Sequence, residues 1–213
     1  MLDQKSIFNI SNNTDFEVLT LEVFKHQFKK NSVYRSFCDL LYIHPSSISS
    51  IEEIPYLPIQ FFKTHKVLSS KNDIQTTFKS SGTTGSIVSK HYITDIELYT
   101  SSFRSCFQHV YGNVQDYVIL ALLPSYLERT NSSLVYMVND FINQSNHQES
   151  GFYLNNYEQL AQTLRSLDAS GKKVLLLGVS FALLALIESH KFDLNHTIVM
   201  ETGGMKGRRK ELI

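Results

Sequence analysis

Apolar residues recur every three or four positions in the first part of the chain, which predicts helices there. The first such segment runs from Asp15 to about Lys30, and Asp15 is suited to be its N-cap. A second helix is expected over 33–43, because Pro45 disfavours helical backbone in the residue before it. The N-terminal part is therefore predicted to be a helical cap.

A connector of a different kind follows. The segment 54–63 contains Pro55 and Pro58, and each proline removes one backbone N–H donor. Two prolines three residues apart exclude a regular helix over this segment. We expect an extended apolar segment that lies on the core.

Beyond residue 70 the hydrophobic pattern alternates between short apolar runs and helical periods. Strands are predicted over 76–79, 91–93, 117–123, 152–154, 173–177 and 197–200, and helices over 94–111, 132–142, 157–167, 179–189 and 206–213. Such alternation is typical of an α/β fold with a largely parallel sheet flanked by helices. We expect two domains, a helical N-terminal cap with its connector over 1–70 and an α/β region over 71–213.

Composition narrows the class of protein. The chain has 213 residues, 42% of them hydrophobic, which is enough for a sizeable core and excludes a mainly disordered chain. Lys plus Arg and Asp plus Glu both number 20, so no basic excess favours nucleic acid. The longest apolar stretch, 174–187, is interrupted by Gly178 and Ser180, so no membrane span is expected. The N-terminal sequence shows no secretory signal, and we expect a cytoplasmic protein.

The two cysteines are not spaced as a disulfide or zinc framework. Cys38 and Cys106 each lie on a predicted helix, and no His or basic group stands beside Cys38 in the sequence. We expect both to be buried packing residues rather than nucleophiles.

The clearest chemical motif is the loop between the first two predicted strands. It reads Ser80, Ser81, Gly82, Thr83, Thr84 and Gly85, and Lys90 follows it. The glycines allow a tight turn whose N–H groups can face an anion, the hydroxyls add donors, and Lys90 adds a positive charge. Lys and Ser/Thr do not follow the second glycine, so this is not a Walker A loop. The four residues Gly-Thr-Thr-Gly alone could equally form an ordinary hairpin loop. The full six-residue motif Ser-Ser-Gly-Thr-Thr-Gly is more specific, and it predicts a phosphate-binding loop.

This loop with its downstream lysine resembles the phosphate-binding loop of the adenylate-forming enzymes. With the segments 55–63, 178–184 and 201–209, the chain is similar to the LuxE-type acyl-protein synthetases from about Phe16 onward, and phenylacetate-CoA ligases are the nearest relatives of that family. The resemblance implies that residues 71–213 form the nucleotide-binding part of an adenylate-forming fold. It implies activation of an acyl or aryl carboxylate with ATP and Mg²⁺, and transfer of the acyl group from an acyl-adenylate to a thiol of a protein Cys or of CoA.

The resemblance also implies roles for individual residues. The ATP phosphates would be held by Ser80, Ser81, Gly82, Thr83, Thr84 and Gly85, with Lys90 as the catalytic cation. Thr202, Gly203 and Gly204 match the glycine pair that lines the adenine and acyl pocket, and Gly178, Ser180 and Phe181 would flank the acyl group. The apolar helix over 179–189 favours an apolar acyl or aryl group. Tyr126, Glu128 and Arg129, which follow a predicted buried strand, are weaker candidates for the substrate mouth.

The family's next motif, Tyr-Gly-x-Thr-Glu, does not occur in the sequence. In the family this motif carries the metal-binding Glu, so we expect the Mg²⁺ ligand outside this sequence. The helix predicted over 206–213 has no C-cap, and Leu212 and Ile213 are apolar. We expect an N-terminal portion of the enzyme with no measurable adenylation by itself, and a homo-oligomer formed through that apolar surface. The alternatives are an acyl-CoA ligase and a non-catalytic nucleotide- or acyl-binding protein.

Overall fold

The computed structural model describes residues 4–80, 87–124 and 131–203. These residues form two compact units, Met1–Ser105 and Cys106–Ile213, whose boundary lies within one helix, α4. The hairpin that follows the connector therefore belongs to the same unit as the N-terminal helices. The division into domains at residue 70 stays a prediction, and the helix predicted over 206–213 lies outside the described residues.

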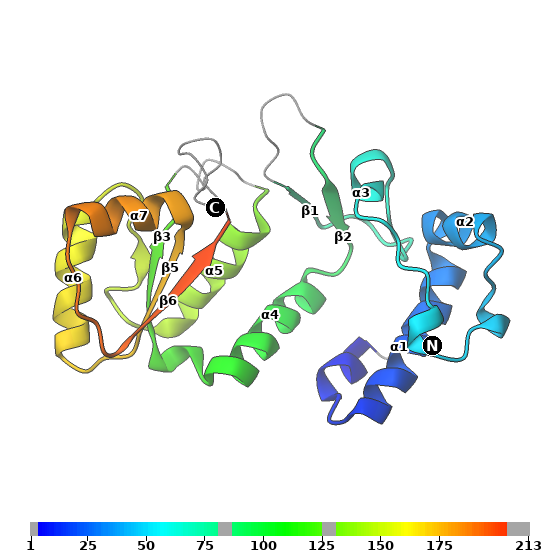
Figure 1. Ribbon diagram of the computed structural model, residues 1–213, viewed down its shortest axis with the longest axis horizontal. Helices are drawn as coiled ribbons and strands as arrows, with labels where there is room; N and C mark the ends of the chain where they lie inside the picture. Colours follow the sequence, from blue (N-terminus) through cyan, green and yellow to red (C-terminus); the bar gives the residue numbers. More distant parts are fainter. Residues whose placement is uncertain (1–3, 81–86, 125–130, 204–213) are drawn as a thin grey trace. The chain divides into compact units, whose positions relative to one another are not determined.

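The N-terminal unit begins with helices, as predicted (Figure 1). Its helical elements are η1 (Gln4–Asn9), α1 (Asn13–Lys30), α2 (Ser32–Leu40), η2 (Pro45–Ser47), η3 (Ile51–Glu53) and α3 (Phe61–Thr64). The predicted N-cap of α1 is wrong by three residues. Asn12 caps the helix, because its backbone is extended and its Oδ1 accepts a hydrogen bond from the Asp15 N–H at 2.9 Å. Asp15 lies in the first turn, where its carboxylate faces the positive end of the helix.

Helices α1 and α2 pack around a small aromatic core. Its buried members are Phe24, Phe28, Tyr34, Cys38 and Ile54. The Tyr34 hydroxyl donates to the Pro55 carbonyl at 2.7 Å, which ties the connector to α2. Burial raises the pKa of the Cys38 thiol, so the prediction of a buried packing cysteine is confirmed there.

The connector is less regular than predicted. Ile54 is buried, but Tyr56 and Ile59 are exposed, so only part of the segment lies on the core. The short helix α3 begins where an extended chain was expected. This is possible because Pro58 lies just before the turn, where its carbonyl accepts from the Phe61 N–H at 3.0 Å and its missing N–H is not needed.

Two strands form a separate antiparallel hairpin. Strand β1 (Thr76–Lys79) pairs with β2 (Lys90–Ile93), with Phe78 opposite His91 and Lys79 opposite Lys90. One face is buried by Phe78, whose ring lies 5.0 Å from that of Tyr99 on α4. The other face carries the exposed lysines.

Helix α4 (Ile96–Tyr111) corrects the prediction for the second cysteine. Its buried positions are Thr100, Phe103 and Phe107, which recur at helical spacing. Cys106 lies off this stripe and is exposed. The prediction of a buried thiol at Cys106 is therefore wrong, because the apolar face of the helix runs through its neighbours.

The second unit is a four-stranded parallel sheet with flanking helices, which confirms the predicted α/β class. The strand order is β4-β3-β5-β6, and all neighbours are parallel. The elements are η4 (Val114–Asp116), β3 (Val118–Leu122), α5 (Ser133–Ser145), β4 (Gly151–Phe152), α6 (Tyr157–Ala169), β5 (Val174–Val179), α7 (Ser180–Ser189) and β6 (Thr197–Thr202).

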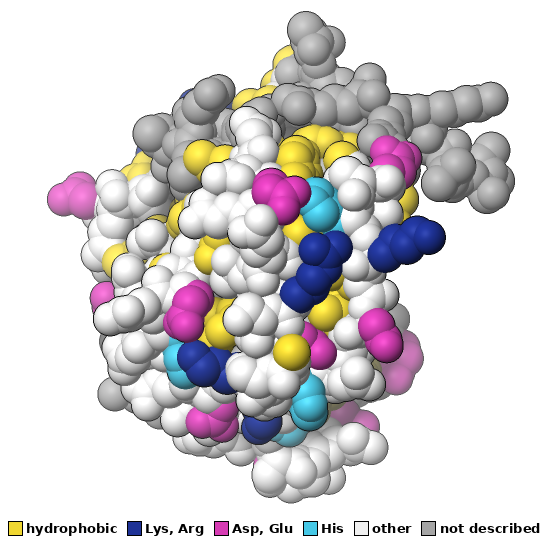
Figure 2. Space-filling model, turned by 90° about the vertical axis from the view of Figure 1, so that its left-hand side faces the viewer, with side chains coloured by type: hydrophobic (Ala, Val, Ile, Leu, Met, Phe, Trp, Pro, Cys, Tyr) yellow, Lys and Arg dark blue, Asp and Glu magenta, His cyan; other side chains and the backbone are white. Residues whose placement is uncertain are grey.

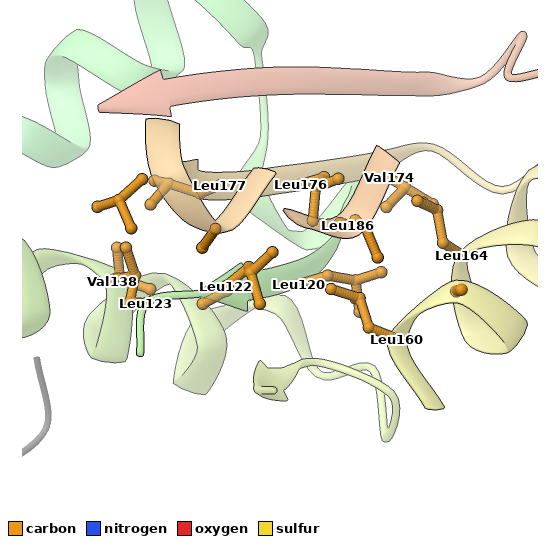
Figure 3. Close-up of a cluster of buried hydrophobic side chains, with 14 of the residues drawn as sticks. Leu120, Leu122, Leu123, Val138, Leu160, Leu164, Val174, Leu176, Leu177 and Leu186 are labelled. Carbon is orange, nitrogen blue, oxygen red and sulfur yellow. The ribbon is translucent and has the colours of Figure 1, made fainter. Parts of the chain in front are cut away.

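The core of this unit lies on the two central strands. Every residue of β3 and β5 is buried, as expected for parallel strands covered on both faces. Leu120 and Leu176 are register partners, and Figure 3 shows them beside Leu186 of α7 and Leu160 of α6. On the face of the molecule in Figure 2, cationic and anionic side chains are interspersed, in line with the equal numbers of acidic and basic residues.

Candidate functional site

The N-terminal unit places the base of the predicted phosphate loop at the end of the hairpin. The Ser80 N–H donates to the Ser89 carbonyl at 3.0 Å, and the Ser89 N–H donates to Ser80 Oγ at 3.0 Å. These two bonds close the base of the loop. Because Ser80 Oγ accepts in this contact, its own hydroxyl proton remains available for a ligand oxygen.

Lys90 begins β2 directly beside this closure, and its side chain is exposed. His91 follows it and lies on the opposite face of the hairpin, as the pleat requires. The His91 ring contacts Phe62 edge-on at 5.8 Å, and although the ring keeps exposed surface, desolvation lowers its pKa. His91 is thereby directed away from the Lys90 ammonium. The loop residues Ser81, Gly82, Thr83, Thr84 and Gly85 lie outside the described residues, and their phosphate contacts stay predictions.

The second unit brings another set of predicted residues together at the carboxyl edge of the sheet. In the register Gly178 lies between Leu122 and Glu201, and Val179 pairs with Thr202. Helix α7 begins immediately after β5, without an intervening loop. Ligands of open α/β sheets bind at this edge, because the strands end there and the following segments diverge.

Ser180 joins the two segments of this edge. Its hydroxyl donates a hydrogen bond to the Gly203 carbonyl, and the Ser180 side chain is buried. Gly203 has φ +72, a backbone conformation that favours glycine. The start of α7 is therefore attached to the turn after β6. Gly204 lies beyond the described residues.

Gly178 is needed for close packing of helix α7 on its strand. A Cβ at this position would lie 2.7 Å from the Leu183 side chain, closer than real Cβ atoms approach. Phe181 is buried and belongs to the core cluster together with Ala182. The roles of Gly178 and Phe181 beside an acyl group stay predictions.

The structure thus groups the predicted site residues in two sets. Ser80 and Lys90 lie in the first unit, and Gly178, Ser180, Phe181, Thr202 and Gly203 lie in the second. The weaker candidates Tyr126, Glu128 and Arg129 lie outside the described residues. The sequence analysis missed Lys79 and Ser89, because their relevance depends on strand register; Lys79 stands next to the motif, which is the one signal that pointed to it.

The described residues also bear on metal binding and on membrane insertion. Over residues 4–80, 87–124 and 131–203 no group of three His, Cys, Asp or Glu side chains could hold a metal ion. The described part therefore offers no protein cage for Mg²⁺. Within the same residues, every helix is too short or too polar to cross a bilayer.

Comparison with known proteins decides the family. The family model described as acyl-protein synthetase, LuxE, matches residues 6–209. The chain belongs to the LuxE acyl-protein synthetase family. The chain is also similar to the long-chain-fatty-acid–luciferin-component ligase of Photorhabdus luminescens, to which it is 37% identical over 68 residues. That match covers 32% of this chain and 58% of the relative, so the chain spans less than two thirds of the relative's length. No solved structure matches the chain.

Proposed function

We propose that this LuxE-family chain takes part in the ATP-dependent activation of a carboxylate through an acyl-adenylate, followed by transfer of the acyl group to a thiol. The observation that carries this proposal is the hairpin that flanks the motif 80–85. The facing ends of its two strands carry Lys79 and Lys90, and Ser80, the first residue of the motif, forms a hydrogen-bonded pair with Ser89. Hydroxyl, backbone and ammonium donors are the groups that bind phosphate oxygens.

Formation of the acyl-adenylate requires groups that neutralise the phosphate charge, rather than a general acid or base. A carboxylate oxygen attacks the α-phosphorus of ATP, the new O–P bond forms, and the bond to pyrophosphate breaks. Negative charge collects on the leaving pyrophosphate, and the Lys90 ammonium would stabilise it. Mg²⁺, when bound to the nucleotide, would neutralise further phosphate charge, and the described residues hold no cluster that would bind the ion alone.

The acyl group is proposed to be apolar. Helix α7 consists mainly of apolar residues, including Leu183, Leu184 and the exposed Ile187. The Photorhabdus relative is named for a long-chain fatty acid, and the family description names an acyl-protein product. We therefore propose a medium- or long-chain fatty acid as substrate and a protein thiol, rather than CoA, as acceptor.

A binding experiment tests the intermediate without requiring turnover. A dodecanoyl-sulfamoyl adenosine, which keeps the geometry of an acyl-adenylate, is titrated into the chain in a calorimeter beside its butanoyl homologue and ATP. Eight additional methylenes contribute up to about 0.8 kcal/mol each when buried, so the long homologue should bind at least about 100-fold more tightly even if half remain exposed.

The outcomes separate the alternatives. Tight binding of the long homologue supports acyl-adenylate chemistry. Equal affinity for both homologues and for ATP would favour a nucleotide-binding protein without an acyl site. Failure to bind ATP and both homologues would contradict the proposed function.

A further inference from the structure

The strand register holds two lysines directly opposite each other at the mouth of the hairpin. Lys79 ends β1, Lys90 begins β2, and they are partners in the antiparallel ladder. Opposite residues of such a pair place their side chains on the same face, with Cβ atoms about 4.5–5.5 Å apart. Hydrogen-bonded and non-hydrogen-bonded pairs alternate along an antiparallel ladder. Ser80 and Ser89 form a hydrogen-bonded pair, so the adjacent pair, Lys79 and Lys90, is non-hydrogen-bonded, and side chains of such pairs approach most closely.

Nothing in the described part of the chain neutralises this pair. Both lysine side chains are exposed, and neither takes part in the ion pairs seen in the described part of the chain, such as those of Arg35, Lys172 and His190. Like charges directly opposite in a ladder destabilise it. The hairpin therefore keeps an arrangement that is unfavourable for its own stability.

A third cation extends this face. The Lys66 ammonium lies 5.6 Å from the centroid of the Tyr92 ring, and Tyr92 is two residues from Lys90, on the same face of β2. The opposite face is the one that Phe78 buries against Tyr99. The hairpin thus separates a packed apolar face from a face that carries Lys66, Lys79 and Lys90.

We propose that Lys79 is a second polyphosphate-binding residue that acts with Lys90, and that Lys66 strengthens the positive field beside them. This inference rests on the proposed function, because it assigns the ligand of the pair to the polyphosphate of ATP. A linear polyphosphate has anionic oxygens on adjacent phosphorus atoms and can contact both ammonium groups at once. Binding replaces the repulsion between the lysines with two charge-assisted contacts.

The test measures binding and stability in the same variants. Lys79→Met should weaken binding of inorganic pyrophosphate and of ATP by about tenfold, the value of one charged hydrogen bond. It should also make the binding less sensitive to salt, since one screened charge is removed. The melting temperature should stay equal or rise, because a like-charge contact is lost. Lys79→Arg should retain most of the affinity, and Lys71→Met, at an exposed lysine of the same unit, should bind like the unsubstituted chain.

Opposite results would overturn the assignment. If Lys79→Met binds pyrophosphate as tightly as the unsubstituted chain while the acyl-adenylate analogue still binds, this inference is wrong and the proposed function stands. If binding and melting temperature fall together and Lys79→Arg rescues neither, Lys79 is a structural residue. If pyrophosphate binding depends on Lys79 but the analogue does not bind, the proposed function fails and the anion site remains. Absence of all phosphate binding would refute both.

Discussion

The hydroxyl of Ser180 donates a hydrogen bond to the main-chain carbonyl of Gly203, which lies 23 residues further along the chain. The contact joins the first turn of α7 to the turn that follows β6, at the carboxyl edge of the parallel sheet. Both residues were singled out by the family resemblance, Gly203 for the pocket of the adenine and acyl groups and Ser180 for the acyl group. The structure shows that a hydrogen bond joins them directly.

Loss of this hydroxyl should lower stability by a small amount. Ser180→Ala removes the hydrogen bond between the buried Ser180 hydroxyl and the Gly203 carbonyl, so we expect a destabilisation of about 0.5–1.5 kcal/mol in urea unfolding. Ser180→Thr keeps the hydroxyl and should lose less. Ser166→Ala, at an exposed serine of α6, serves as the control and should change little. Equal stability of Ser180→Ala and the unsubstituted chain would show that the hydrogen bond contributes nothing.

The packing of Gly178 against Leu183 predicts an energetic coupling between these positions. Gly178→Ala places a Cβ against the Leu183 side chain, so we expect a cost of about 1–3 kcal/mol from overpacking. In a Leu183→Ala background the space exists, and the same substitution should cost much less. A double-mutant cycle from denaturant unfolding measures the difference. Additive effects would mean that the strain at Gly178 has another source.

Asp168 should make stability depend on acidic pH. Its carboxylate accepts hydrogen bonds from the Asn195 N–H at 2.9 Å, the His196 N–H at 2.8 Å and Thr197 Oγ1 at 2.7 Å. These bonds, that from Asn195 first, hold the pKa of Asp168 below its ordinary value.

The sign follows from linkage. Because the folded pKa is the lower one, the stabilisation is present above the unfolded pKa of about 4 and is lost as the pH falls through the folded pKa. Thermal melts between pH 2 and pH 7 should therefore show a smaller acid-induced loss in Asp168→Asn than in the unsubstituted chain. Asp73→Asn, at an exposed aspartate, is the matched control. An unchanged pH profile in Asp168→Asn would contradict the assignment.

The two thiols should differ sharply in reactivity. Cys106 is exposed, whereas Cys38 is fully buried and has a raised pKa. Brief treatment of the native chain with iodoacetamide should alkylate Cys106 alone, and denaturation should expose Cys38, as mass spectrometry of peptides will show. Modification of Cys38 at the same rate as Cys106 in the native state would be inconsistent with the packing of α1 and α2. Cys38→Ala should lower the free energy of unfolding by about 1 kcal/mol, the value of one small buried group.

Local patterns in the sequence were enough for the fold class. The runs over β3 and β5 are apolar throughout because helices cover both faces, and alternation with helical periods then favours an α/β sheet. The loop 80–85 was also recognisable, because its glycines and hydroxyls are contiguous in the chain. The sequence was less decisive where two residues suit the same position. Asn12 and Asp15 are both residue types that favour an N-cap, and Asn12 is the one that caps α1.

The tertiary structure alone decided which distant residues meet. The periodicity of a segment reports which of its faces is buried, but it carries no information about its neighbour, its register or the exposure of a residue beside the apolar stripe. The order β4-β3-β5-β6, the pairing of Lys79 with Lys90 and the Ser180–Gly203 bond all depend on such long-range choices. The exposure of Cys106 has the same origin. The buried face of α4 runs through Phe103 and Phe107, and Cys106, which is adjacent to Phe107 in the chain, lies outside that face.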